Sequence, residues 1–215
     1  MMFPYMKKDG RTTDTKERLF LAALDLFAEK GMEATSIRDI VKRVGISTAA
    51  FYNHFDGKDA LLKAVYESYR ERHGIPASKS EREYEQLAAT VDPVSFFQES
   101  TALFLQAMKD PVMDKLGRIV SMEKGRNPAA AEISYADRQG LLRAMESVGA
   151  AFGRKGCWKG RDARMVGRIL GYIQLAVFED NHYHRLVGKM GPEEIAKRTN
   201  GILIPILKEL MEEKP

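Results

Sequence analysis

Cysteine and long hydrophobic runs are nearly absent from this sequence. Its 215 residues include one cysteine, Cys157, which cannot form an internal disulfide. No stretch approaches the ~20 consecutive apolar residues that cross a bilayer. The N-terminal sequence MMFPYMKKDGRTTDTK lacks the apolar run and the cleavage site of a secretory signal. We therefore expect a cytoplasmic protein with no membrane partner.

A strong excess of one charge is also missing. Lys and Arg number 34 against 30 Asp and Glu, a net charge of +4, which is too small to indicate nucleic-acid binding by itself. The excess is partly local, since residues 137–168 contain eight basic and three acidic side chains. A solvated surface on long helices and an anion-binding surface both explain this local excess, and the sequence leaves the choice open.

The third absence is the period-two alternation typical of β-strands. Apolar residues recur three and four positions apart instead, which predicts an all-α fold. Glycine and proline mark the breaks between helices, and Pro205 should kink the last helix. The predicted helices are a first ending at Gly31, a second from Thr35 or Ser36 to Gly45, a third from Ser47 to Asp56, then 58–74 and, near these bounds, 93–109, 111–124, 128–153, 161–187 and 192–212. Residues 76–93 read as a connection with a short charged helical piece.

Residues 35–55 have the layout of a helix-turn-helix. Two short helices flank a turn at Gly45, whose missing side chain suits a left-handed backbone conformation. In TAAFYNHF, Phe51 and Phe55 are four residues apart and face the core, so Tyr52 and Asn53 project outward. A helix of this width fits the major groove of DNA. We expect base contacts from Thr48, Ala49 and Asn53, and phosphate contacts from Thr35, Ser36, Ser47, Tyr52, His54 and Lys58.

The segment ATSIRDIVKRVGISTAAFYNHFDGKDAL resembles the DNA-binding signature of the TetR family of bacterial transcriptional regulators. The resemblance is specific from about Thr15 to Leu62, and beyond Pro76 it extends only to the number and length of helices. It implies an all-α homodimer that binds a palindromic DNA operator, usually as a repressor, and releases it when a small molecule binds the C-terminal domain. Many members have Lys-Gly where this chain has Thr48-Ala49, so the operator preference cannot be taken from relatives.

The resemblance also suggests how the chain is divided. We expect an N-terminal arm over residues 1–14, a helix-turn-helix DNA-binding domain over 15–62, and an effector-binding and dimerisation domain over 63–215. The helix at 58–74 would join the two domains and carry movement between them. The arm contains Lys7, Lys8 and Arg11, which could reach the DNA backbone.

Two sets of residues are expected to serve the C-terminal domain. Aromatic and methionine side chains suit the lining of an effector pocket. Aliphatic faces on the last two helices suit an antiparallel pair that forms a four-helix interface with a second copy. The pocket candidates are Phe104, Met108, Met122, Phe152, Trp158, Tyr172 and Phe178. The interface candidates are Ile169, Ile173, Ala176, Val177, Ile202, Ile206 and Leu210.

Two other functions compete with the ligand-responsive regulator. The first is an all-α metal-dependent enzyme, because Glu179 and His182 share a helical face, although His184 lies on another. The second is a DNA-binding regulator that has no small-molecule pocket and responds to a protein partner. We favour the ligand-responsive regulator and expect no enzyme activity, cofactor or metal ion.

Overall fold

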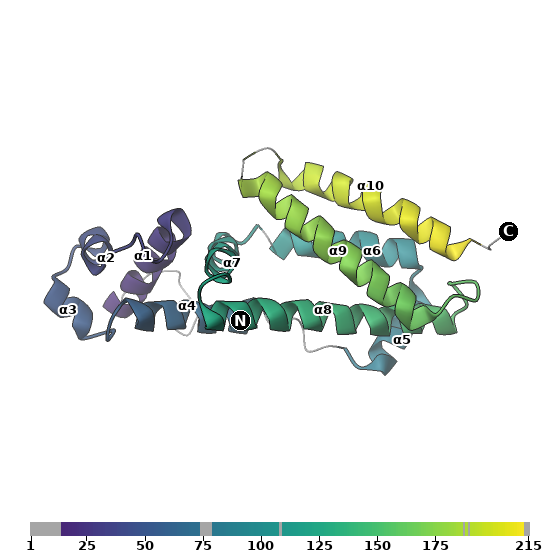
Figure 1. Ribbon diagram of the computed structural model, residues 1–215, viewed down its shortest axis with the longest axis horizontal. Coiled ribbons are helices and arrows are strands. Elements are labelled where there is room, and N and C mark those ends of the chain that lie inside the picture. Colours follow the sequence, from purple (N-terminus) through teal and green to yellow (C-terminus); the bar gives the residue numbers. More distant parts are fainter. Residues whose placement is uncertain (1–13, 74–78, 108, 187, 189, 213–215) are drawn as a thin grey trace. The chain divides into compact units, whose positions relative to one another are not determined.

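The computed structural model describes residues 14–73, 79–107, 109–186, 188 and 190–212, and these form helices joined by turns, without a strand (Figure 1). The predicted all-α fold is confirmed. From residue 93 onward, each predicted helix agrees with the structure to within two residues at both ends. The helices are α1 (Thr15–Lys30), α2 (Ile37–Val44), α3 (Thr48–Tyr52), α4 (Lys58–His73), α5 (Glu81–Thr90), α6 (Pro93–Ala107), α7 (Pro111–Glu123), α8 (Pro128–Arg154), α9 (Ala163–Leu186) and α10 (Pro192–Met211).

Two predicted segments differ from the structure. α3 ends at Tyr52 instead of reaching Asp56, because residues 53 and 54 form a turn in which the amide of His54 donates to the carbonyl of Phe51, three residues back. The segment before Pro93 contains a regular helix, α5, which Ser80 and Glu83 begin with a reciprocal capping box. α10 continues through Pro205 to Met211.

The chain divides into two compact units, and the first consists of the described residues up to 73 together with 109–135. Its apolar core joins α1 to α4 with α7 and the start of α8. α7 lies far along the sequence from α1 and α4 but packs against both. The largest fully buried side chains of this core are Phe20, Phe27, Phe51, Leu19, Leu24, Ile40, Leu61, Leu116 and Ile119. The predicted domain boundary at residue 62 stays a prediction, while α7 belongs to the packing of this unit.

Ion pairs reinforce the attachment of α7 to the helix-turn-helix. Lys115 Nζ on α7 lies 2.6 Å from Asp25 Oδ1 on α1, and Arg43 on α2 lies 3.3 Å from the other oxygen of Asp25. Arg126, just after α7, pairs with Glu33 at 3.0 Å. These side chains are partly exposed, so each pair adds at most about 1 kcal/mol.

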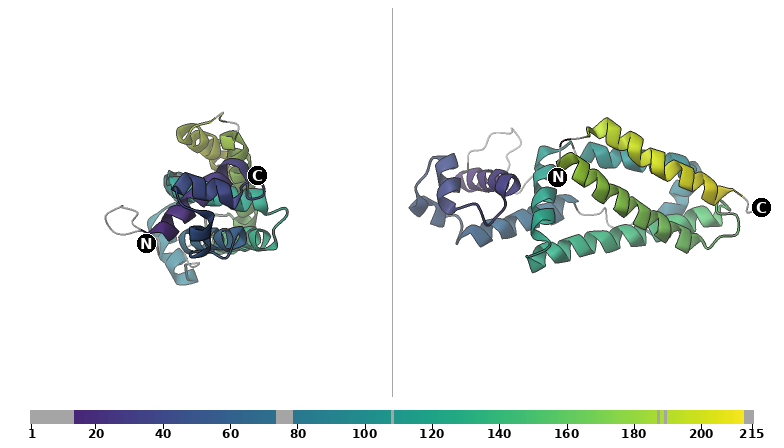
Figure 2. Two further views of the ribbon diagram at one scale, coloured as in Figure 1. Left: turned by 90° about the vertical axis from the view of Figure 1, so that its left-hand side faces the viewer. Right: turned by 45° about the horizontal axis from the view of Figure 1, so that its top comes forward.

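The second unit contains the described residues of α5, α6, α9 and α10 and the part of α8 from residue 136. α10 lies alongside α6 and α9, as both views in Figures 1 and 2 show. α8 and α9 cross with unusually close backbones: a Cβ atom on Gly167 would lie 2.1 Å from the carbonyl oxygen of Met145, and one on Gly149 would lie 2.3 Å from that of Ala163. Only glycine fits at such a crossing.

Several basic residues between 137 and 168 make contacts within the second unit. Arg154 and Arg164 pair with Glu85 and Glu81 of α5 at 2.7 and 2.9 Å. Arg161 donates to the carbonyl oxygens of Glu209, Leu210 and Glu212 at the end of α10. Lys155 Nζ similarly binds the carbonyls of Ala88 and Val91. Four of the eight basic side chains in this segment therefore make contacts with α5, the residue after it, or the end of α10.

None of the described helices has both the length and the uniformly apolar composition that crossing a membrane requires.

Candidate nucleic-acid interface

The start of α2 is determined by a capping box. Ser36 Oγ accepts a hydrogen bond from the amide of Asp39 at 3.1 Å, and Asp39 Oδ2 accepts one from the amide of Ser36 at 2.9 Å. At the other end Gly45 has φ +78°, a left-handed conformation, and its amide donates to Val41. These local signals fix both ends of the first helix of the motif.

The capping box predicts a specific dependence on acid pH. Hydrogen bonds from the Ser36 backbone, then from Lys30 and the Ser36 hydroxyl, lower the pKa of Asp39 from 3.8 to about 2. A lowered pKa means that the ionised carboxylate stabilises the folded state above pH ~4 and that this contribution disappears as pH falls toward 2. We expect Asp39→Asn to lower the free energy of unfolding at pH 6 but to change it much less at pH 2.5, as measured by urea unfolding. An equal loss at both pH values would contradict this assignment.

α3 is held by its aromatic side chains and by its own cap. Ser47 Oγ accepts from the amide of Ala50 at 3.1 Å, which starts the helix. Phe51 is fully buried, with its ring centroid 6.1 Å from that of Phe55 and 5.4 Å from that of Tyr52. The ammonium group of Lys16 lies 5.5 Å from the centre of the Phe55 ring. α3 is thus fixed on the core through one face.

The opposite face of α3 is exposed. Thr48, Ala49 and Asn53, the predicted base readers, are all exposed, and so is Ser47. Tyr52 is 54 % exposed, a high value for an aromatic side chain. The side chain of His54 is half-buried, as expected at the margin of the face. The structure therefore gathers these residues on one accessible surface, which we call the α3 face.

Two of the predicted phosphate contacts have internal roles instead. Thr35 is 1 % exposed, and its hydroxyl donates to the carbonyl of Gly31 at 2.8 Å. Lys58 Nζ donates to the carbonyls of Met32 and Thr35 at 2.7 and 2.9 Å. The reason is geometric: the first residue of α4 faces the turn between α1 and α2, whose carbonyls have no helical partner. Ser36 stays exposed, although its hydroxyl caps α2.

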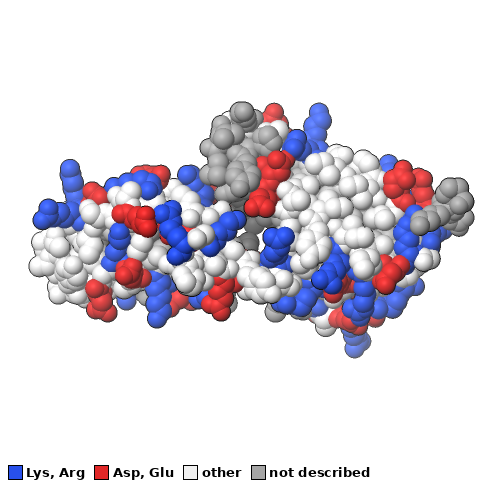
Figure 3. Space-filling view, viewed as in Figure 1, with Lys and Arg blue, Asp and Glu red and all other residues white. Residues whose placement is uncertain are grey.

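The α3 face carries no ionic side chain. No Lys, Arg, Asp or Glu occurs from Gly45 to Phe55, and the end of the first unit that α3 forms is uncharged in Figure 3. Elsewhere on that face of the unit, basic and acidic residues are interspersed (Figure 3). Contacts of α3 with phosphate would thus be hydrogen bonds from neutral donors such as Ser47 and Tyr52.

The predicted pocket residues do not form one cluster. Phe104 and Phe178 stack with ring centroids 4.1 Å apart. Phe152 and Trp158 are 1 % exposed in the apolar core of the second unit, and the indole of Trp158 donates to the carbonyl of Gly149. Met122 packs against the core of the first unit, Tyr172 is 44 % exposed, and Met108 lies outside the described residues. The spacing of aromatic and methionine residues in the sequence does not distinguish buried core residues from residues that line a pocket.

Part of the predicted dimer interface lies on the exposed surface of α9. Ile169 and Ala176 are exposed, while Ile173, Ile202, Ile206 and Leu210 are half-buried. Val177 is 6 % exposed and belongs to the interior. Met165 and Tyr172 are exposed and share the Ile169–Ala176 side at helical spacing, a signal that the sequence reasoning missed. A broad uncharged area covers α9 and α10 in Figure 3.

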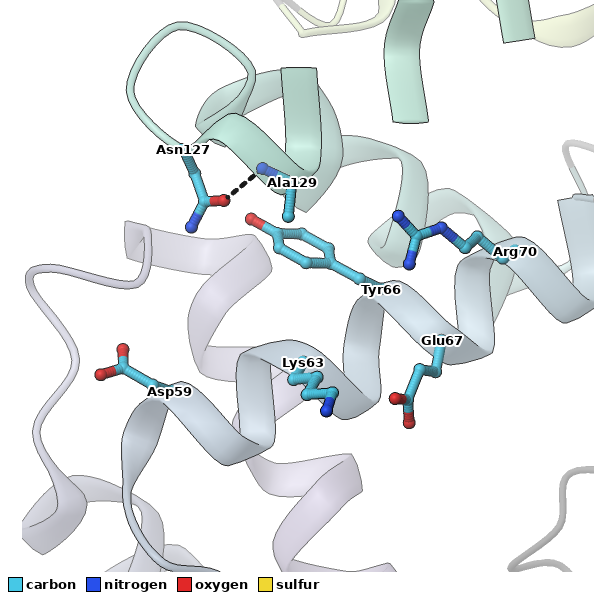
Figure 4. Close-up of a pocket in the computed structure, with 7 residues that line it drawn as sticks. All are labelled: Asp59, Lys63, Tyr66, Glu67, Arg70, Asn127 and Ala129. Atoms are coloured by element: carbon cyan, nitrogen blue, oxygen red, sulfur yellow. Dashed lines mark hydrogen bonds between the residues drawn. The ribbon is translucent and has the colours of Figure 1, made fainter. Parts of the chain in front are cut away.

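The structure also contains a hollow that the sequence did not suggest. It has a volume of about 300 Å³ in the first unit, and Figure 4 shows its lining from α4 and the start of α8. Burial, and to a lesser degree Glu123, raises the pKa of Tyr66 to about 12, so this phenol stays neutral. The lining residues carry charges of both signs and are Asp59, Lys63, Tyr66, Glu67, Arg70, Asn127 and Ala129.

A metal site is not formed by the residues that the structure describes, since no three His, Cys, Asp or Glu side chains among them converge. Glu179 is exposed on α9. The side chains of His182 and His184, which the enzyme alternative requires, lie outside the described part of the chain, as does the basic arm before residue 14.

Comparison with known proteins places the helix-turn-helix in context. Residues 19–65 match the family model described as "Bacterial regulatory proteins, tetR family". The chain is 46 % identical over 56 residues to the uncharacterized HTH-type transcriptional regulator YerO of Bacillus subtilis, covering 26 % of this chain and 19 % of YerO. It is 31 % identical over 108 residues to the HTH-type transcriptional regulator TtgR of Pseudomonas putida, covering 50 % of this chain and 48 % of TtgR. The aligned part therefore spans half or less of these relatives.

Solved structures resemble the chain over most of its length. A transcriptional regulator from Aquifex aeolicus superposes with a TM-score of 0.61 at 21 % identity, covering 90 % of this chain and 99 % of that chain. NalD, the secondary repressor of the MexAB-OprM multidrug efflux pump in Pseudomonas aeruginosa, superposes with a TM-score of 0.57 at 22 % identity, covering 93 % and 97 %. At these identities the likeness concerns the fold alone.

Proposed function

We propose that this chain is a DNA-binding transcriptional regulator of the TetR family, because residues 19–65, which contain its helix-turn-helix, match the model of that family. In this proposal the protein is a repressor, and a small-molecule effector releases it from a palindromic operator. The DNA-binding part corresponds to residues 15–62, and the effector-binding and dimerisation part to 63–215. The protein would act in the cytoplasm, where its operator is, and it would need no cofactor.

The observation that carries this proposal is the α3 face. Thr48 and Ala49 on α3 and Asn53 directly after it are exposed, while the buried Phe51 fixes the helix from behind. Amide and hydroxyl groups on a helix of this size can meet base edges in the major groove. Ser47 and Tyr52 flank them with neutral donors for phosphate oxygens. We assign base reading to the first three residues and backbone contacts to the last two, with His54 and Ser36 at the margin.

A palindromic operator requires two such faces. We propose a homodimer formed through the uncharged surface of α9 and α10, which exposes Met165, Ile169, Tyr172 and Ala176. Exposed apolar side chains in one helical row are typical of a contact between subunits. The two-fold axis of the dimer would then place two α3 helices about 34 Å apart on successive major grooves.

Selection of bound DNA from the genome that encodes the protein tests the proposal. The full-length protein should enrich fragments that contain an inverted repeat, with half-sites about one helical turn apart. The matched control is the same protein with Asn53→Ala and Tyr52→Ala, which keeps the buried anchor Phe51. Enrichment no better than that of the control would reject the assignment of the α3 face.

Single substitutions on α3 should separate base reading from backbone contact. Asn53→Ala is expected to reduce discrimination at one base pair of each half-site by about 1–3 kcal/mol, roughly five-fold to 150-fold. Tyr52→Phe removes only a hydroxyl and is expected to weaken binding to specific and nonspecific DNA to a similar extent. Fluorescence anisotropy with wild-type, singly mutated and random duplexes measures both effects. If the two variants lose affinity for all duplexes alike, the division of roles is wrong.

A further inference from the structure

The inner face of α9 changes character along its length. In the first half, Gly167 approaches the backbone of Met145 so closely that no side chain fits. In the second half the inward positions carry Gln174, Phe178 and Asn181, at spacings of four and three residues that place them on one face. Close packing thus gives way to amide and aromatic groups within the same helix.

Two of these amides are buried without a partner for their carbonyl oxygen. Gln174 is 5 % exposed and Asn181 is 3 % exposed. Among the described residues, neither Gln174 Oε1 nor Asn181 Oδ1 meets a hydrogen-bond donor, and the same holds for Asn200 Oδ1 on α10. An unpaired buried acceptor destabilises a fold, and each such case calls for an explanation. Several acceptors on neighbouring helices point to a ligand that supplies donors.

Aromatic and hydroxyl groups occur on the same half of α9 and on the two helices beside it. The rings of Phe104 on α6 and Phe178 on α9 are stacked at 4.1 Å with an interplanar angle of 11°, and both are only half-buried. Asn181 Nδ2 donates to Thr199 Oγ1 on α10 at 2.9 Å. These contacts join α6, α9 and α10, which lie together in Figures 1 and 2. We call the set the amide–aromatic cluster: Phe104, Gln174, Phe178, Asn181, Thr199 and Asn200.

The two rings of the amide–aromatic cluster are separate from the apolar core of the second unit. Phe152 and Trp158 belong to that core, whereas Phe104 and Phe178 do not.

We propose that the amide–aromatic cluster binds the effector and selects a planar aromatic molecule that carries N–H or O–H donors. The stacked phenylalanine rings offer a flat apolar surface for the ring system. The carbonyl oxygens accept hydrogen bonds from the donors, and their negative ends disfavour a carboxylate. This inference rests on the proposed function, since only a regulator released by a small molecule has an effector.

Three probes of one ring system test this selectivity. We use 2,6-dihydroxynaphthalene, its dimethyl ether, and naphthalene-2,6-dicarboxylate, because they share a flat ring and differ in donors and charge. Isothermal titration calorimetry with the full-length protein, without DNA, should show binding of the diol at least ten-fold tighter than that of the ether, and no binding of the dicarboxylate.

A substitution in the cluster links the selectivity to the amides. Gln174→Met keeps the length of the side chain but removes the acceptor, so the affinity for the diol should fall about ten-fold while that for the ether stays the same. The melting temperature should not fall, because an unpaired buried amide is replaced by an apolar group. Gln98→Met, at an exposed position of α6, is the control and should change neither affinity.

The outcomes distinguish this inference from the proposed function. Equal binding of all three probes, no binding of any at millimolar concentration, or an unchanged diol affinity in Gln174→Met would overturn the role of the cluster. Operator binding, measured separately without any probe, would still stand in that case and would favour a regulator that answers to a protein partner. Selective binding of the diol without operator recognition would instead reject the proposed function while supporting a ligand site.

Discussion

Replacing Lys58 with methionine is expected to lower operator affinity at least ten-fold without changing how that affinity depends on salt. The Lys58 ammonium group is hydrogen-bonded to the carbonyls of Met32 and Thr35, so it connects the first residue of α4 to the turn before α2. Hydrogen bonds from a charged group contribute about 1.5–3 kcal/mol each. Loss of both should destabilise the first unit by about 3–6 kcal/mol and loosen the support of the helix-turn-helix.

The salt dependence decides between this internal role and the phosphate contact that the sequence suggested. Loss of one phosphate contact reduces the slope of log affinity against log salt by about 0.9, whereas loss of an internal contact leaves the slope unchanged. Lys63→Met is the matched control, since Lys63 is exposed on the same helix and its loss removes an equal charge. A reduced slope in Lys58→Met, with wild-type stability, would restore the phosphate contact.

The glycine at the crossing of α8 and α9 should show the largest effect on stability. Gly167→Ala places a Cβ atom 2.1 Å from a backbone oxygen of Met145, a clash that a side-chain movement cannot relieve. Separating two packed helices costs more than ordinary overpacking, and we expect a loss above about 4 kcal/mol. Trp158, the single tryptophan, is buried in the same unit, so its fluorescence during urea unfolding reports the change directly.

A glycine-to-alanine substitution elsewhere in that unit should raise the free energy of unfolding instead of lowering it. Gly201 lies inside α10, and a Cβ atom there would have no neighbour within 4 Å. Gly201→Ala should therefore stabilise the protein by up to about 1 kcal/mol, because alanine has the higher helix propensity. If both variants were destabilised alike, or Gly167→Ala were harmless, the close approach of the two backbones would be refuted.

Local signals explain why most helices could be predicted from the sequence. Ser36, Gly45 and Ser47 act on residues at most four positions away, so their roles as caps and turn follow from the sequence pattern itself. The orientation of Phe51 toward the core also follows from its spacing to Phe55. The end of α3 was missed because the turn at residues 53 and 54 contains neither glycine nor proline.

Roles that depend on distant residues could not be read in the same way. Lys58 follows the helix-turn-helix at a position where the sequence predicts a phosphate contact. Only the fold shows that the carbonyls of Met32 and Thr35 lie within its reach. Phe104 and Phe152 look alike in sequence, yet one stacks on Phe178 and the other is buried in the core. In the sequence, a glycine inside a helix, such as Gly167, indicates low helix propensity. In the fold, the missing side chain of Gly167 allows α8 and α9 to approach each other closely.

The packing of α7 within the first unit bears on which segments of this chain can be exchanged for those of another protein. Leu116, Ile119 and Val120 of α7 contribute to the core that supports the helix-turn-helix, although more than 30 residues of sequence separate them from α4. Recombination that joined residues 1–74 to the remainder of a distant relative would pair α1 and α4 with a foreign α7. Exchange of the whole N-terminal segment would therefore disturb this core, whereas point changes at the exposed positions of α3 would leave it intact.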